Sequence, residues 1–153
     1  MKGLQMELKS LMVDTKETWV EFPGCNGFEV KVVNLARKEL MALRKRCITT
    51  KFDRKTRQPI EELDDEKFIS EFTRATIKDW KGLKLKYLEQ FILVDLTKQD
   101  PESVLEYSED NAELLVSNSG DFDTWLNEVI FDLDNFRSPT KGPAVAAPGK
   151  VVQ

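Results

Sequence analysis

The chain has 153 residues, the length of one ordinary domain, with 41% hydrophobic and 33% charged side chains. This apolar content is enough for a core and argues against disorder along the whole chain. The net charge of −4 argues against a protein that binds nucleic acid through a globally basic surface.

The first segments of the chain predict a short helix followed by a β-hairpin. Residues 1–16 place leucine or methionine at the i, i+4, i+7 and i+8 positions of a helix that is amphipathic but marginal on its own. Residues 18–22 and 28–33 flank a turn rich in proline, glycine and asparagine, and apolar and charged side chains alternate in the second segment. This pattern is typical of two antiparallel strands joined by a tight turn.

A second helix is expected over residues 35–48. Asn34 is the predicted N-cap, because an asparagine side chain accepts a hydrogen bond from a free N–H of the first turn. The apolar pattern of this helix is imperfect, since its polar side chains do not all fall on one face. Residues 49–59 are polar and basic, and they predict either a loop or a second small hairpin.

A third helix is expected to begin at Asp64 or Asp65 and to continue through Trp80, with Gly82 after its end. The next segment, residues 83–96, has two interpretations that the sequence leaves open. Its apolar residues fit one face of a helix, but its run of four consecutive apolar residues fits a buried strand equally well.

Two helices and a tail complete the chain. Ser108 is expected to cap the first helix, which ends near Asn118, and residues 121–136 have the most regular helical pattern of the sequence. Residues 138–153 contain three of the six prolines and no aromatic residue, so we expect a disordered tail. The prediction is an α+β fold: a mostly helical small domain over residues 1–137 with an N-terminal β-hairpin and a disordered C-terminal tail.

Charge is distributed unevenly along the chain. Residues 37–57 hold nine basic and two acidic side chains, whereas residues 100–136 hold eleven acidic ones and no lysine or arginine. The basic segment suits either an acidic protein partner or nucleic acid, although Phe52 is the only aromatic residue there to stack on bases. Opposite blocks on one small domain also allow two copies to associate head to tail.

Candidate binding residues come from the basic helix and from the tryptophans. A tryptophan on an apolar stripe is explained by core packing, whereas an exposed one is a common anchor for a protein partner. Five residues are the candidates for a protein-binding surface: Arg37, Arg44, Lys45, Trp80 and Trp125.

The sequence offers little for catalysis. It has no histidine, which removes Ser-His-Asp and Cys-His catalysis and histidine-containing metal sites. Cys25 and Cys47 are too few for a disulfide scaffold or a four-cysteine zinc site, and the acidic residues lack the spacing of a calcium loop. No apolar run reaches the length of a membrane span, and the first residues lack the core of a secretory signal. We therefore expect a soluble, cytosolic, non-enzymatic protein without cofactor or metal.

Three stretches become informative when their order along the chain is considered: WVEFPGCNGFEVKVVNLARKELMALRKR, RATIKDWKGL and EYSEDNAELLVSNSGDFDTWLNEVIFDLDNFR. Together they resemble the tail assembly chaperones of long-tailed bacteriophages. The first is similar to the strand pair and helix that open that family, the second to its helix that ends in a tryptophan and a glycine, and the third to its closing helices. The resemblance covers residues 13–137, and the basic stretch 37–57 departs from it.

The resemblance implies a non-enzymatic role in virion assembly, in the host cytoplasm. Proteins of that family bind the long helical tape measure protein, help to recruit tail tube subunits and are absent from the mature virion. A soluble acidic protein with amphipathic anchors is physically suited to covering the apolar helix faces of such a partner. The expected partners are the tape measure protein and the tail tube protein, a homo-oligomer is possible, and no membrane is involved. The alternative is a small nucleic-acid-binding or regulatory phage protein that uses residues 37–57.

Overall fold

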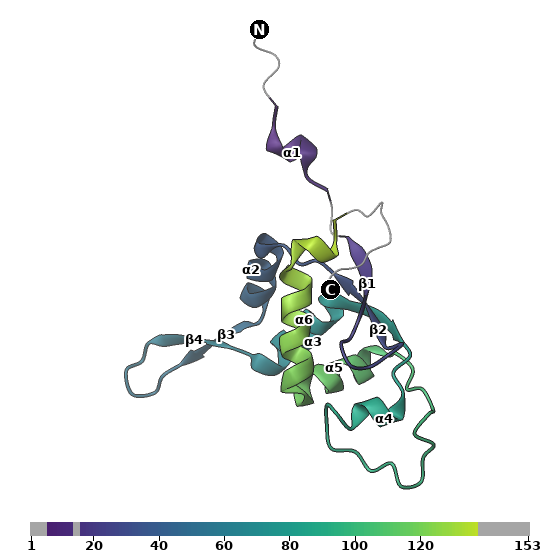
Figure 1. Ribbon diagram of the computed structural model, residues 1–153. Helices are drawn as coiled ribbons and strands as arrows, with labels where there is room; N and C mark the ends of the chain where they lie inside the picture. The colour runs from purple at the N-terminus through teal and green to yellow at the C-terminus, as the bar shows by residue number, and fades with distance from the viewer. Residues whose placement is uncertain (1–5, 14–15, 138–153) are drawn as a thin grey trace.

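The computed structural model describes residues 6–13 and 16–137 of the chain (Figure 1). Its N-terminal part forms a single helical turn, α1 (Leu8–Leu11), which extends away from the rest of the molecule and buries none of its residues. Within residues 6–13 the helix expected over residues 1–16 is found only as this turn, because a short helix without tertiary contacts has little to hold it. Residues 1–5 and 14–15 of that prediction, and the predicted disorder of residues 138–153, lie outside the described residues.

A three-stranded antiparallel sheet has its strands in the order β1–β2–β5. β1 (Glu17–Glu21) and β2 (Glu29–Val33) pair as the predicted N-terminal hairpin, with Val20 opposite Val30. The alternation along β2 places valines in the core and charged side chains on the outer face of the sheet. The third strand, β5 (Ile77–Lys81), pairs with the other edge of β2.

β5 shows that the prediction of a helix running through Trp80 is wrong. Helix α3 (Asp65–Thr76) begins as expected after Asp64, whose side chain accepts a hydrogen bond from the backbone N–H of Lys67 at 3.1 Å. The helix ends before Ile77, because the following residues complete the hydrogen bonding of β2, which otherwise has an open edge. Ile77 and Trp80 are both buried by this pairing, although their spacing of three also fits a helix face.

Gly82 follows a strand rather than the expected helix, and it brings two segments of backbone together. Its φ is +75°, and an added Cβ would lie 1.9 Å from the carbonyl oxygen of Gly27 in the turn of the first hairpin. The chain then makes one helical turn, α4 (Leu85–Leu88), and continues as an irregular loop. Neither the helix nor the strand expected over residues 83–96 is right beyond this turn, because buried Leu83 and its neighbours anchor a loop on the core.

Helix α2 (Arg37–Arg46) is shorter at both ends than the expected range, and Asn34 is not its N-cap. The Nδ2 of Asn34 instead donates a hydrogen bond to the backbone oxygen of Ile130 at 3.0 Å. At the start of the helix, the side chain of Glu39 accepts a hydrogen bond from the backbone N–H of Ala36 at 3.0 Å. The prediction of the cap failed because a partner 96 residues away competes for the asparagine side chain.

Residues 49–59 form the second hairpin rather than a plain loop. β3 (Ile48–Phe52) and β4 (Pro59–Leu63) are antiparallel, and they project from the body of the molecule (Figure 1). Nine of their ten residues are exposed. Residues 48–63 are named the arm below.

The C-terminal helices agree with the prediction at their beginnings. Ser108 caps α5 (Glu109–Asn118) by accepting a hydrogen bond from the third backbone N–H of the helix at 3.0 Å. α6 (Gly120–Phe131) follows at once but ends before the expected residue 136. The chain bends into a short 3₁₀ helix, η2 (Leu133–Asn135), which turns Phe136 into the core from a new direction.

The core lies between the inner face of the sheet and the helices α3, α5 and α6, and its buried side chains form one cluster (Figure 1). Aromatic rings form part of it, with Phe22 4.9 Å from both Phe91 and Trp125 between ring centroids. The predicted α+β fold with an N-terminal hairpin is confirmed.

Candidate protein-binding surfaces

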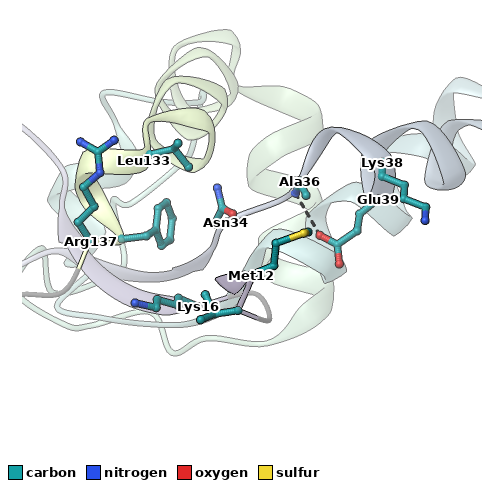
Figure 2. Close-up of a pocket in the computed structure, with 10 residues that line it drawn as sticks. Met12, Lys16, Asn34, Ala36, Lys38, Glu39, Leu133 and Arg137 are labelled. Carbon is teal, nitrogen blue, oxygen red and sulfur yellow. Dashed lines mark hydrogen bonds between the residues drawn. The ribbon is translucent and has the colours of Figure 1, made fainter. Parts of the chain in front are cut away.

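A pocket of about 740 Å³ lies where the N-terminal segment, the start of α2 and the end of the described chain meet (Figure 2). Pockets of roughly 300–1,000 Å³ are typical of binding sites. Ten residues line it: Met12, Val13, Lys16, Asn34, Ala36, Lys38, Glu39, Leu133, Phe136 and Arg137. Three come from the N-terminal segment, four from residues 34–39 and three from residues 133–137, so the pocket exists only because the fold brings these three segments together.

The pocket offers an occupant a largely apolar lining. Met12 is 68% exposed, Val13 is 70% exposed and Leu133 is 55% exposed, while Phe136 is buried beside them. Apolar side chains left this open lose contact with water when a partner covers them, and this burial favours binding. The pocket therefore suits an apolar side chain, or several, presented by another segment.

The charged side chains around the pocket are mostly basic. Lys16, Lys38 and Arg137 contribute positive charge, and Arg137 pairs with Asp134. Glu39 is the only carboxylate of the lining, and one of its oxygens already accepts the hydrogen bond from Ala36 that Figure 2 shows as a dashed line. An occupant with acidic groups beside its apolar ones is therefore favoured over a basic one.

The N-terminal segment continues this apolar surface away from the pocket. Its large apolar side chains are between 59% and 73% exposed: Met6, Leu8, Leu11, Met12 and Val13. An exposed apolar run of this kind marks an interaction site on a protein, since isolated surface leucines are common but contiguous ones are not. The segment and the pocket form one candidate surface, which we name the pocket surface.

The arm is the second candidate surface. Phe52 is 73% exposed near its tip, and Ile60 on the paired strand is 43% exposed. The turn between the strands carries Arg54, Lys55 and Arg57, and none of these makes a salt bridge within the described part of the chain. The arm thus presents apolar side chains together with unpaired positive charge.

The structure does not bring the five candidate residues of the sequence onto one surface. Arg37, Arg44 and Lys45 are exposed on α2, as a binding role requires. Trp80 is only 4% exposed, and its indole N–H donates to a backbone oxygen at 2.9 Å, so its side chain belongs to the core. Trp125 is half-buried and packs on aromatic neighbours.

The pocket residues were not found by sequence reasoning. Met12 falls within residues 1–16, which the sequence predicts as a short amphipathic helix, and Leu133 and Phe136 fall within residues 121–136, which it predicts as one regular helix. The one local signal that points to them is the pair of aspartates on either side of Leu133, because Asp132 ends α6 and caps η2. Because α6 ends there, Leu133 and Phe136 are not part of its apolar face and instead line the pocket.

The two thiols are in environments that make them poor nucleophiles. Cys25 and Cys47 are both buried and unpaired, and burial raises the pKa of each thiol above its usual value. Among residues 6–13 and 16–137, no group of three or more cysteine and carboxylate side chains is placed to hold a metal ion. No helix in the same ranges is both long and apolar enough to cross a membrane.

Comparison with known proteins gives no assignment: neither a protein-family model, nor a curated protein, nor a solved structure matches this chain.

Proposed function

We propose that this protein is a non-enzymatic tail assembly chaperone of a long-tailed bacteriophage that binds apolar segments of the helical tape measure protein. The observation that carries the proposal is the pocket surface, with its exposed Met12, Val13 and Leu133 around a volume of about 740 Å³. A helix that lays one apolar face on such a surface can insert side chains spaced by three or four residues. The function of the chaperone would be to shield the apolar helix faces of the tape measure protein from water and from each other before the tail tube encloses that protein.

The order of the segments also supports the proposal. The hairpin of β1 and β2 leads into α2, and the Ser108-capped α5 leads into α6, as the resemblance to that family implies. The middle motif differs, because Trp80 lies on a strand and not at the end of a helix. In the proposed role the protein also helps to recruit tail tube subunits, acts in the host cytoplasm and is absent from the mature virion.

The test measures binding of purified tape measure fragments by calorimetry to the full chain and to variants of the pocket surface. Leu133→Glu and Met12→Glu each place a charge on an apolar position that is more than half exposed, so the fold should tolerate them. We expect each to weaken binding at least tenfold. Leu93→Glu is the matched control, because Leu93 is fully exposed and does not line the pocket.

Two results would contradict the proposal. One is the absence of binding between the unaltered protein and every fragment of a complete tape measure series. The other is equal binding by the Leu133→Glu and Leu93→Glu variants, which would place the contact elsewhere.

A second candidate function is nucleic-acid binding by the arm, favoured by the exposed Phe52 beside the unpaired cations of the turn. An aromatic ring and phosphate-binding cations are the elements of such a site, although one ring gives only a small stacking platform. The affinity of the protein for duplex DNA, measured over a range of salt concentrations, separates the two functions. A steep fall with salt that disappears in Arg54→Glu/Lys55→Glu would favour nucleic acid.

A further inference from the structure

The arm lacks the contacts that usually stabilise a two-stranded sheet. β3 and β4 form five residue pairs, from Ile48 opposite Leu63 to Phe52 opposite Pro59. The base is held by the backbone N–H of Asp64, which donates to the oxygen of Cys47 at 2.7 Å. Of the ten residues in the two strands, only Leu63 at the base is partly buried, and the other nine are exposed. An isolated hairpin of this kind is marginal in water, so a partner that covers one face would stabilise it.

The turn at the tip of the arm directs positive charge outward. The Oδ1 of Asp53 accepts a hydrogen bond from the backbone N–H of Lys55 at 2.8 Å, so the one carboxylate of the turn is already engaged. Arg57 has a φ of +60° and is the only residue other than glycine with a positive φ in the described chain. This left-handed conformation lets the chain reverse direction between β3 and β4, and the backbone N–H of Arg57 donates a hydrogen bond to the oxygen of Asp53 at 2.7 Å. The tip thus combines three cations and a backbone conformation that glycine would adopt more easily.

A surface of opposite charge lies on the C-terminal helices. Asp121 and Glu128 are exposed and seven residues apart on one face of α6, and Asp110 is exposed on α5, which packs beside it. None of these three carboxylates makes a salt bridge within the part of the chain that the structure describes. Leu114 lies one turn after Asp110 and is 59% exposed. Asp110 and Leu114 of α5 and Asp121 and Glu128 of α6 lie on two helices that contact each other, and these four exposed residues are named the acidic face.

We propose that the arm of one molecule docks on the acidic face of a second copy of this chain. The cations of the tip meet the carboxylates, and Phe52, on the face of the arm that it shares with its paired Pro59, meets Leu114. Charge complementarity favours a second copy as the partner, because the arm carries unpaired positive charge and the acidic face carries unpaired negative charge. Each surface also has exposed apolar area. The arm projects away from the body of its own molecule, so the contact joins different copies (Figure 1).

This contact goes beyond the proposed chaperone function because it uses neither Met12 nor Leu133 of the pocket surface. It joins two different patches, so repeated copies assemble head to tail instead of through one symmetric patch. Several copies held this way would present their pocket surfaces in series to one long partner. Because the contact depends on exposed charges, its strength falls as salt rises.

The test is a charge-swap experiment read by sedimentation velocity in low and in high salt. The unaltered chain is expected to associate at low salt and to dissociate at high salt. Arg54→Glu/Lys55→Glu on the arm and Asp121→Lys/Glu128→Lys on the acidic face should each weaken association at low salt at least tenfold. An equimolar mixture of the two variants should associate again, since the arm of the first then carries charge opposite to the face of the second.

Controls separate this contact from general charge effects and from misfolding. Lys9→Glu/Lys98→Glu changes the net charge as the arm variant does, but at positions outside the arm and the acidic face, and this control should associate as the unaltered chain does. If the lysine variant of the acidic face unfolds in a thermal melt, Asp121→Asn/Glu128→Gln replaces it, with weakened association as the expected result. Binding of a tape measure fragment by the arm variant, measured in parallel, reports on the proposed function separately.

The proposal is overturned by an unaltered chain that stays monomeric at low salt, or by an arm variant that associates as strongly as the unaltered chain. It is also overturned if the mixed variants fail to associate while each is folded. A monomeric chain that binds duplex DNA through Arg54 and Lys55, with a steep salt dependence, would assign the arm to nucleic acid instead.

Discussion

Replacing Gly82 by alanine is expected to destabilise the fold more than the same change at Gly24 or Gly120. The φ of +75° costs a residue with a Cβ about 1–2 kcal/mol. The added Cβ would also lie 1.9 Å from the oxygen and 2.7 Å from the carbonyl carbon of Gly27. Both atoms are backbone, so relief requires β5 to move away from the turn of the first hairpin. Overpacking of this kind costs about 1–3 kcal/mol, which gives a total of about 3 kcal/mol.

Thermal unfolding followed by circular dichroism measures this loss. For a domain of this size, about 3 kcal/mol lowers the Tm by roughly 12 °C. Gly24→Ala isolates the conformational cost, because Gly24 has a φ of +88° but nothing lies within 4 Å of an added Cβ. Gly120→Ala should change the Tm little, since its backbone is unstrained and the space is open. Equal Tm values for the Gly82 and Gly24 variants would refute the close approach of the two backbones.

Two further predictions concern a helix cap and an ion pair. Ser119→Ala removes the buried hydroxyl that accepts a hydrogen bond from the backbone N–H of Phe122 at 3.1 Å, and should lower the free energy of unfolding by about 1 kcal/mol in urea titrations. Hydrogen bonds from Lys86 and then Lys84 hold the pKa of Glu102 below its usual value, so NMR titration should place its carboxyl at a lower pH than in Lys86→Met. The stabilisation from this contact is present above the ordinary glutamate pKa and is lost as the pH falls through the lowered one.

The predictions for Ser119→Ala and for Lys86→Met each have a matched control variant. Ser117→Ala removes a hydroxyl that bonds within its own helix at an exposed position, so it should leave the unfolding midpoint nearly unchanged. An effect of Ser119→Ala no larger than that of Ser117→Ala would contradict the cap. For the ion pair, Lys98→Met removes a lysine away from Glu102. A titration of Glu102 that shifts equally in the Lys86 and Lys98 variants would show that the specific contact is not its cause.

Elements with local signals were predicted correctly from the sequence. The alternation around the Pro-Gly and Asn-Gly turn identified the hairpin of β1 and β2, because strand faces and turn geometry are both encoded within about fifteen residues. Ser108 and Asp64 identified the starts of α5 and α3, because each cap bonds to a backbone N–H three residues later. These features depend on neighbours in the chain and are therefore readable without the fold.

Elements that depend on distant partners were predicted wrongly. Ile77 and Trp80 fit a helix by spacing, and only the open edge of β2 makes them a strand. Asn34 has the side chain of a good cap, but its amide is engaged by Ile130. The pocket has the same origin: Met12 and Leu133 are 121 positions apart in the sequence and meet only after the core has formed. No pattern within either segment indicates the other.

The free energy that holds this fold comes from one core, and two projecting segments take little part in it. α1 buries none of its residues, and the strands of the arm are almost entirely exposed. Fixing the backbone costs roughly 1–2 kcal/mol per residue, which such segments hardly offset by themselves. A partner that buries Leu8, Leu11 or Phe52 supplies apolar burial at about 25 cal/mol per Å². Part of the binding energy is then used to order the segment, so each contact is weaker than its area suggests. Contacts of that strength form and break readily, which suits the proposed role of a protein that must leave its partner when assembly is complete.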